Sequence, residues 1–527
     1  MLLTTLVLVA QASTAPIHCG TPVFDALRPK TPVPMPVVRK DCRPPRLGET
    51  RLMWLQNMSV MPPQQYQASV TCRGVGNHCY VMVDDSAWNA GQMDSADAAR
   101  IIERFDRSSP RDSNHGVWYY NTTVFGQPPD AIDHDSLVYL VYHDIGSFHG
   151  YTFDGFWQYF DEYYDTTSMR LFGYHSNEIE CVYLDCYPNN PSQDYRIAIA
   201  AHEFAHMIHW NYDQAESLWV NEGCAELAMW LFGSPDAISG FNSNSDNDLT
   251  SWTGSWADYI KTYLFCLYLY EHYGGRVGTD LIHNIVASPF ANIEGVDSGF
   301  AATGLSERFE VVLDEWVLAN IVNDTTYLGG RYGYFGEWVP RFAAASYHGT
   351  YPVSRNGSLS RWAGEYILFQ HGTGLELTFD GADNGNFHVY VVGKDTVNHR
   401  LLLDSVRLDS LQSGSASVPN SDTGYQSVWL VPVNHYPWGT MTYAYSATAS
   451  GIEENAPEGT GNRISGTTVV RAGTRVSVSG PYRLFSAEGR LAGTGSDRIE
   501  TACLPAGTYL IQSPGGRRPL HGLTVVR

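Results

Sequence analysis

Residues 202–206 read His-Glu-Phe-Ala-His, which is the pattern HExxH. Positions i and i+4 of a helix lie on one face, one turn apart, so the imidazoles of His202 and His206 can reach a single metal ion. Glu203 lies beside that face, where its carboxylate can touch a water molecule on the ion. Apolar residues flank the motif, as a helix buried behind a site requires. The spacing therefore predicts a helix with two metal ligands and a general base.

A third ligand has to come from elsewhere, because a catalytic zinc ion takes three protein ligands and keeps one position open for water. The metzincin extension xxGxxH fails here, since His209 and Tyr212 stand at its glycine and histidine positions. The other known solution is a glutamate on a second helix. The run 218–228, LWVNEGCAELA, carries Glu222 sixteen residues after His206 and Glu226 one helical turn later.

Residues 219–223, Trp-Val-Asn-Glu-Gly, resemble the W-[LV]-N-E-G signature of hyicolysin-type peptidases and of the aminopeptidase N/leukotriene-hydrolase group. The wider pattern, AHEFAHMIHW followed by WVNEGCAELAMW, is most similar to the hyicolysin-like secreted bacterial peptidases, which are gluzincins. The resemblance implies one catalytic zinc ion with Glu222 as its third ligand. It also implies that Glu226 accepts the second ring N–H of His202 and fixes its tautomer.

Residues 259–275 are similar, at equal length, to the helix that follows the catalytic tyrosine of the leukotriene-hydrolase group. The resemblance implies that the phenol of Tyr259 donates to the oxyanion of the tetrahedral intermediate. Two alternatives stay open. Tyr259 could be only the first core aromatic of its helix, or Tyr263 could be the donor.

The resemblance as a whole implies a zinc metallopeptidase that cleaves extracellular proteins or peptides. Zinc would acidify a water molecule, and Glu203 would take its proton and later pass it to the leaving amine. We expect an endopeptidase, because the G-x-M-E-N segment that holds the substrate's amine in related aminopeptidases is missing. The alternative is a surface adhesion or carbohydrate-binding protein with an inactive peptidase-like domain, although the ligand and base residues are all intact.

The elements that must position these residues change in type along the chain. Alternating apolar and polar residues predict strands over 64–83, 137–142 and 179–184. Helical periodicity predicts helices over 96–106, capped by Ser95, and over 195–210, 219–231 and 259–273. We therefore expect an α+β core of the zincin type over residues 16–345, with a β-rich N-terminal part and a helical part that holds the active site.

Two all-β domains are expected after this core. Short strand patterns at turn-rich spacing predict a β-sandwich over 346–450, followed by a polar, Pro/Gly-rich linker over 451–465. Residues 466–527 contain Gly489-Arg490 and the run Leu-Pro-Ala-Gly-Thr-Tyr at 504–509. These resemble the C-terminal sorting domain of type IX secretion, which implies export and would allow attachment to the outer surface.

The N-terminus and the cysteines also indicate export. Residues 1–15 fit a signal peptide, with Ala10-Gln11-Ala12 as an A-x-A cleavage site, and no other segment is apolar enough to span a membrane. We therefore expect a protein that is secreted or held at the bacterial cell surface. Nine cysteines predict local disulfides. The expected pairs are Cys72–Cys79, Cys181–Cys186 and, more weakly founded, Cys19–Cys42, with Cys224 and Cys266 as buried thiols.

The net charge of −22 argues against nucleic acid, because a phosphate-binding surface needs clustered Lys and Arg. Protein or peptide substrates remain, and we expect a monomer. Asp154, Asp161, Glu162 and Asp165 form an acidic run that raises the question of a calcium ion. Since the run lacks EF-hand spacing, a solvated loop is the expectation, and Ca²⁺ stays open as a second ion.

Overall fold

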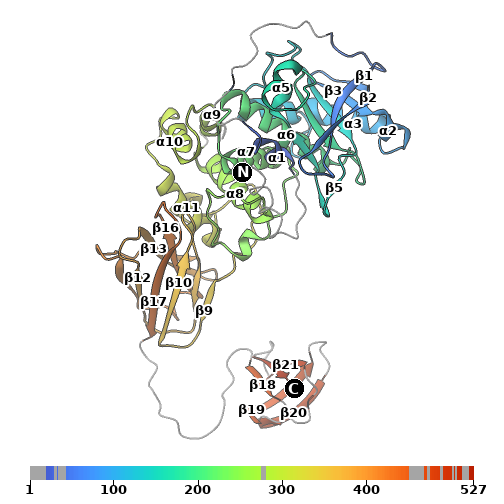
Figure 1. The fold of residues 1–527 in the computed structure, drawn as a ribbon. Helices are drawn as coiled ribbons and strands as arrows, with labels where there is room; N and C mark the ends of the chain where they lie inside the picture. Colours follow the sequence, from blue (N-terminus) through green and yellow to red (C-terminus); the bar gives the residue numbers. More distant parts are fainter. Residues whose placement is uncertain are drawn as a thin grey trace. The chain divides into compact units, whose positions relative to one another are not determined.

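The computed structural model describes residues 19–28, 33, 43–273 and 280–449, with Leu504 and the strands between 468 and 526. The predicted signal peptide and linker lie outside the described residues. The chain divides into two compact units, Met1–Gly451 and Ile452–Arg527 (Figure 1). The first unit holds both the predicted peptidase core and the predicted sandwich, and it carries the candidate site.

A six-stranded mixed sheet forms one layer of the first unit, in the order β1-β2-β3-β4-β8-β7. Its strands are β1 (Thr50–Asn57), β2 (Gln64–Val75), β3 (Cys79–Asp84), β4 (Val138–His143), β7 (Gly155–Trp157) and β8 (Cys181–Asp185). Strands β3, β4 and β8 run parallel, whereas the edge strand β7 runs antiparallel to β8. The strands expected over 64–83, 137–142 and 179–184 are thereby confirmed. A small hairpin, β5 (Ser147–Phe148) with β6 (Tyr151–Thr152), leads into β7.

Short helices accompany this sheet. They are α1 (Thr21–Asp25), α2 (Asp85–Asn89), α3 (Ser95–Asp106), α4 (Val117–Val124), η2 (Tyr159–Glu162) and α5 (Asp165–Leu171). The predicted cap of α3 is wrong by one residue. Asp94, not Ser95, accepts hydrogen bonds from the first free N–H groups, and Asp97 bonds back to the amide of Asp94 in a capping box.

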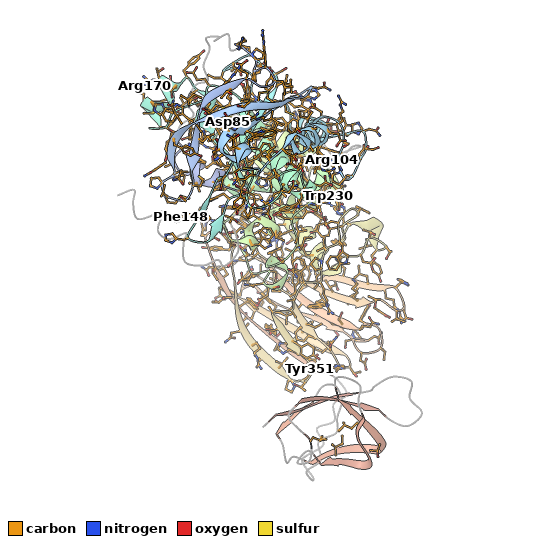
Figure 2. All side chains as sticks on the ribbon, turned by 90° about the vertical axis from the view of Figure 1, so that its right-hand side faces the viewer. Asp85, Arg104, Phe148, Arg170, Trp230 and Tyr351 are labelled. Carbon is orange, nitrogen blue, oxygen red and sulfur yellow. The ribbon has the colours of Figure 1, made fainter. Side chains whose placement is uncertain are left out.

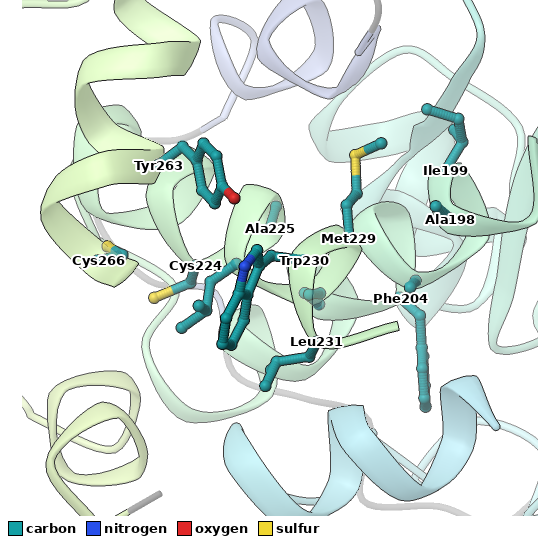
Figure 3. Close-up of a cluster of buried hydrophobic side chains, with 14 of the residues drawn as sticks. Ala198, Ile199, Phe204, Cys224, Ala225, Met229, Trp230, Leu231, Tyr263 and Cys266 are labelled. Carbon is teal, nitrogen blue, oxygen red and sulfur yellow. The ribbon is translucent and has the colours of Figure 1, made fainter. Parts of the chain in front are cut away.

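The helical part follows the sheet in sequence. It consists of α6 (Asp194–Tyr212), α7 (Leu218–Phe232), α8 (Trp256–Tyr273), α9 (Asp280–Val286), α10 (Asn292–Ala302) and α11 (Phe309–Val322), with short turns η3 (Phe241–Ser243) and η5 (Leu328–Gly330). The three helices expected to carry the site are present. In Figure 3 the apolar side chains of α7 lie between Phe204 of α6 and Tyr263 of α8. This core fixes the three helices against one another.

Two glycines, one within α7 and one directly after it, explain how this helix packs against α8 and where it ends. A Cβ at Gly223 would lie 2.6 Å from Cys266 Sγ and 3.0 Å from the carbonyl of Thr262, so only glycine lets α8 approach this closely. Gly233 ends the helix with φ of 101°, a left-handed conformation that favours glycine. The glycine of the W-V-N-E-G segment is thus needed for packing next to the site.

Residues 346–449 form the predicted β-sandwich. One sheet has the order β10-β17-β12-β15 and the other β14-β13-β16-β11-β9. The strands are β9 (Ser346–His348), β10 (Val353–Leu359), β11 (Ile367–Phe369), β12 (Leu375–Gly381), β13 (Phe387–Asp395), β14 (Arg400–Ser405), β15 (Ser413–Val418), β16 (Ser427–Asn434) and β17 (Met441–Ala449). The outer face of the second sheet joins the main core through Trp362, Tyr366 and Trp429, and β13 and β16 contact α11. Figure 2 shows Tyr351 at the end of the sandwich far from Asp85 and Arg104.

The second unit has one five-stranded sheet in the order β18-β22-β21-β19-β20. Its strands are β18 (Thr468–Arg471), β19 (Arg475–Ser486), β20 (Leu491–Glu500), β21 (Gly507–Gln512) and β22 (His521–Val526). An α+β part followed by all-β parts is therefore confirmed as the fold class. The Gly489-Arg490 pair of the sorting-domain resemblance lies outside the described residues. In the part of the chain that is described, no helix is long and apolar enough to cross a membrane.

The expected local disulfides are wrong: Cys72, Cys79, Cys181 and Cys186 are buried free thiols. Cys72 pairs with Met82 across β2 and β3. Cys79 instead lies at the turn between the two strands, after the last pair, Val75 with Tyr80. Cys181 opens β8 and Cys186 follows its end, which places them about 16 Å apart along an extended strand. Cys42 lies outside the described residues, and its expected partner Cys19 has a free thiol inside the candidate site.

Candidate metal centre

Helix α6 supplies the first half of the site. His202, Glu203 and His206 are all buried, at no more than 2% exposure, and the two imidazole rings lie 4.8 Å apart, centroid to centroid. The helix is held against its neighbours from several sides. Asn121 of α4 donates to the carbonyl of Ala201 at 2.7 Å, and Gly155 of β7 packs directly against α6. The motif is therefore rigidly placed below the edge strand.

Helix α7 supplies the carboxylates. Glu222 Oε2 lies 3.4 Å from His202 Nε2 and 3.7 Å from His206 Nε2, so it faces the same nitrogen of both imidazoles. Glu226 Oε1 lies 3.3 Å from the other nitrogen of His202, Nδ1. The corresponding nitrogen of His206 bonds to Asn221 Oδ1 at 2.5 Å. Each imidazole thus turns Nε2 toward Glu222 and Nδ1 toward an orienting oxygen.

The polar atoms at the centre of this arrangement lack partners. Within the described residues, neither nitrogen of His202 and neither carboxylate oxygen of Glu222 makes a hydrogen bond, although both side chains are buried. The contacts above 3.3 Å therefore bring these groups together without satisfying them. Buried polar groups without partners cost free energy, and a cation bound between them removes that cost. The residues present fit a divalent metal ion.

A segment far away in sequence completes the group. Cys19 Sγ lies 3.4 Å from His206 Nε2, and the ligand atoms of Cys19, His202, His206 and Glu222 all lie within 4.8 Å of one another. Thr21 Oγ1 donates to Glu203 Oε2 at 2.8 Å. The amide of Gly20 donates to the carbonyl of Gly155 at 2.8 Å, in a parallel bridge on the edge strand β7. An extended piece of chain therefore covers both the metal group and the general base.

Burial governs the protonation of the site. It lowers the pKa of His206 to about 4, so this imidazole is neutral and free to bind a cation near pH 7. It raises the pKa of Glu203 to about 7, near the pH at which a group can both take and return a proton. Burial also raises the pKa of the Cys19 thiol well above its usual value, so only a nearby cation would favour the thiolate.

The two tyrosines differ in how they are engaged. Burial and, after it, the charges of Glu222 and Cys19 raise the pKa of Tyr259, which places its phenol within reach of the site's electric field. Its hydroxyl makes no hydrogen bond within the described residues. Tyr263 instead donates to Glu337 Oε2 at 2.6 Å. Of the two, only Tyr259 has a hydroxyl available to another acceptor.

The other polar residues singled out in the sequence lie outside the metal group. His209 is buried but outside the metal group, and burial lowers its pKa to about 3. The expected solvated loop is wrong for Asp154, Asp161 and Glu162, which are at most 5% exposed. Asp154 comes directly before the edge strand β7, and Asp161 and Glu162 lie in η2 after it. Asp165 stays partly exposed at the start of α5.

Sequence reasoning missed Cys19, Thr21 and Asn221. Asn221 stands in the W-V-N-E-G segment, and its position one residue before Glu222 was a usable signal. Cys19 lies 187 positions from its closest metal-group contact, His206, and no local pattern connects the two.

No family model matches this chain, and no curated protein matches it. Among solved structures, the pre-peptidase C-terminal domain of a Bacillus anthracis collagenase matches 20% of this chain and 97% of its own, at 12% identity and a TM-score of 0.17. A GH115 4-O-methyl-alpha-glucuronidase matches 49% of this chain and 30% of its own, at 10% identity and 0.14. A Bacillus licheniformis lipase in propeptide form matches 73% and 89%, at 11% and 0.15. TM-scores this low carry no argument about fold or function.

Proposed function

We propose that the chain is a secreted zinc metallopeptidase of the gluzincin kind, which hydrolyses peptide bonds of extracellular proteins. The observation that carries the proposal is the convergence of His202, His206 and Glu222 beside Glu203, with the buried atoms of His202 and Glu222 lacking hydrogen bonds within the described residues. Two imidazoles and one carboxylate are the ligand set of a catalytic zinc ion that keeps a position open. A zincin-type core, with the edge strand β7 above the metal helix, is part of the same proposal.

The chain's residues divide the chemistry among them. A zinc ion held by His202, His206 and Glu222 would supply a Lewis acid that polarises the scissile carbonyl and acidifies water. Glu203 would take the proton from the attacking water and return it to the leaving amine. Tyr259 would donate a hydrogen bond to the oxyanion, and Glu226 and Asn221 would hold the two imidazoles in their tautomers. Strand β7, whose edge already pairs with Gly20, would bind an extended peptide in the same way.

The test combines metal content with cleavage. The full chain and its Glu203→Gln variant are loaded with zinc, and both are also made in a Cys19→Ser background because Cys19 touches the metal group. We expect about one zinc per chain in all four proteins. We expect casein hydrolysis to fall by about 10²–10⁴-fold in the Glu203→Gln proteins, since the general base is lost.

Glu310→Gln serves as the matched control, because Glu310 is an exposed glutamate of α11. Its hydrolysis should equal that of its parent. Bound zinc without any Glu203-dependent cleavage, in either background, would favour the alternative of an inactive peptidase-like domain on a binding protein.

A further inference from the structure

We propose that Cys19 is a fourth ligand of the metal centre and that the segment 19–28 holds the site in a latent state. This inference rests on the proposed function, because it assigns a regulation to the same site. The thiol does not stand alone: it lies in one group with His202, His206 and Glu222, and within the described residues the buried atoms of His202 and Glu222 make no hydrogen bond. Thiolate sulfur is a preferred ligand of zinc.

The segment occupies each part of the site that a substrate and its water need. Cys19 Sγ, 3.4 Å from His206 Nε2 and 3.7 Å from Glu203 Oε2, takes the space of the water. Thr21 Oγ1 donates a hydrogen bond to Glu203 Oε2, the oxygen that would accept the proton of the water. Gly20 pairs with Gly155 on the edge strand where a substrate would pair. The base, the open metal position and the strand edge are thus all blocked at once.

The segment is anchored on the site rather than resting on it. Thr21 Oγ1 also accepts a hydrogen bond from the N–H of Trp157 at 2.8 Å, and it lies 3.2 Å from the carbonyl oxygen of Trp157. Phe24 is fully buried against Phe156, and Arg28 bonds to Asp25 and to the carbonyl of Gln214. Water can reach the metal position only when the Cys19 sulfur leaves it.

Cobalt(II) substitution tests the ligand directly, because a thiolate ligand gives cobalt a strong near-ultraviolet charge-transfer absorption. We expect the full chain loaded with Co²⁺ to show this band, and the Cys19→Ser variant to lose it while keeping one Co²⁺ per chain. Cys186→Ser is the matched control, since Cys186 is buried beside Gln92 and outside the metal group. The zinc-loaded Cys19→Ser variant should hydrolyse casein at least tenfold faster than the full chain.

The outcomes separate the latch from the peptidase. An unchanged cobalt band in Cys19→Ser would overturn the latch whatever the activity. If Cys19→Ser loses the band but gains no cleavage, the assignment of Cys19 as a metal ligand stands. That result would count against the proposed function. A chain that binds no Co²⁺ in either form would overturn both.

A separate observation points to a second cation site. We infer that Asp133, Glu162 and Glu180 bind a calcium ion at the edge of the sheet where β4 and β8 begin. Both oxygens of Glu162, both of Glu180 and Oδ2 of Asp133 are buried, and none has a hydrogen-bond partner among the described residues. None of these three side chains is more than 2% exposed. They form no ion pair within the described part of the chain.

The topology brings the three carboxylates together. β7 runs antiparallel to β8, so the turn η2 that ends at Glu162 returns to the start of β8, next to Glu180. The carbonyl of Glu180 accepts from Tyr139 at the start of β4, and Asp133 lies in the loop before that strand. Ligand oxygens of Asp130, Asp133 and Glu180 fall within 4.8 Å of one another. The charges of Glu162 and Asp133 add to burial in raising the pKa of Glu180.

The chemistry selects the ion. The site offers only oxygen ligands from carboxylates, which suits a hard cation rather than zinc, and a cluster that includes two glutamates can supply the six to eight oxygens that Ca²⁺ takes. Mg²⁺ keeps several waters and a smaller octahedral shell, which a buried group of this kind supports poorly. A bound ion would neutralise three buried charges and brace η2 behind the edge strand.

Calcium binding is measured by titration calorimetry on the zinc-loaded full chain, and its effect by thermal unfolding in millimolar CaCl₂ or MgCl₂. We expect one Ca²⁺ per chain and a rise in Tm of several degrees with Ca²⁺ but little with Mg²⁺. The double variant Glu162→Gln/Glu180→Gln should lose this rise, because two of the three carboxylate ligands are gone. Glu310→Gln should respond as the full chain does.

A full chain that neither binds Ca²⁺ nor gains Tm from it would overturn the site. So would a double variant that keeps the whole response. If the double variant fails to fold, the single variant Asp133→Asn gives the same comparison, with weakened calcium binding as the expected result.

Discussion

The structure contains two groups with the same donor types, two histidines and one carboxylate, in opposite states. In the metal centre, the buried atoms of His202 and Glu222 make no hydrogen bond to any residue that the structure describes. In the Asp314 cluster, formed by Asp314, His388 and His435, the carboxylate accepts from both imidazoles at 2.6 and 2.7 Å. Donor type therefore does not identify a metal site. What sets the metal centre apart is that the unsatisfied buried atoms of two side chains, His202 and Glu222, face each other across the site.

The two groups also differ in what surrounds them. In the Asp314 cluster the rings of His388 and His435 stack at 3.9 Å, and Tyr390 donates a third hydrogen bond to Asp314 at 2.8 Å. These contacts join α11 to the sandwich strands β13 and β16. Within the described residues Nδ1 of His435 is left without a partner, but both oxygens of Asp314 are bonded, and the cluster holds two parts of one unit together.

The largest expected effect comes from exchanging one histidine in each group. His206→Gln should weaken zinc binding by about a hundredfold or more and abolish cleavage, because a direct ligand is lost. His435→Gln should keep one zinc per chain. Metal content after dialysis, followed by the change in Tm on adding a chelator, measures both. Loss of zinc from His435→Gln with full retention in His206→Gln would reverse the assignment of the two groups.

A second comparison uses the tyrosine of each group. Tyr259→Phe in the Cys19→Ser background should lower casein hydrolysis by about a hundredfold, since a hydrogen bond to the oxyanion is lost, with little change in Tm. Tyr390→Phe should lower stability by about 1 kcal/mol and leave hydrolysis unchanged. Steady-state rates and denaturant unfolding measure the two effects. Equal rates for Tyr259→Phe and its parent would reduce Tyr259 to a core aromatic.

Neutralising each carboxylate in the metal-free chain sharpens the comparison further. Asp314→Asn should lower the free energy of unfolding by about 3 kcal/mol, because three donors lose a charged, buried acceptor. Glu222→Gln should leave the stability of the metal-free chain unchanged or raise it, because it removes a buried carboxylate that makes no hydrogen bond within the described residues. Denaturant unfolding with chelator present measures both. A large destabilisation by Glu222→Gln would mean that its charge is already compensated.

The smallest expected effect is a pH dependence of the Asp314 cluster. The hydrogen bond to Asp314 raises the pKa of His388, whereas burial would lower it. Although burial alone would raise the pKa of Asp314, hydrogen bonds from His388 and His435 lower it. The stabilisation from His388 is thus complete below about pH 6.5 and is lost as pH rises through the folded pKa, while that from Asp314 is lost as pH falls below about 4.

The measurement is the free energy of unfolding between pH 5 and 9 for the full chain and for His388→Gln. Since the His388 side chain is 43% exposed, we expect the extra decline of the full chain above pH 6.5 to stay below about 1 kcal/mol. Parallel curves for the two proteins would remove His388 from the pH dependence.

Much of the frame around the site could be predicted from the sequence. The helices of HExxH and W-V-N-E-G begin and end within two residues of their expected bounds. The strands β2 and β3, expected over 64–83, follow their alternating patterns. Such patterns act over one or two turns, so they are set by neighbours in the chain. Local chemistry misled where long-range packing mattered, as in the cysteine pairs and in the acidic run, which is buried.

The amino-acid sequence by itself determined that His202, Glu203 and His206 share one helix, and that a glutamate on the next helix is at hand. Only the tertiary structure decided which glutamate faces both Nε2 atoms, and that Cys19 joins them across 183 positions or more. It also decided that the charge of Glu162 acts on Glu180 and raises its pKa. The physical reason is the distance along the chain over which each kind of interaction acts. Helical periodicity fixes positions a few residues apart, but the meeting of distant side chains depends on how the whole core packs around them.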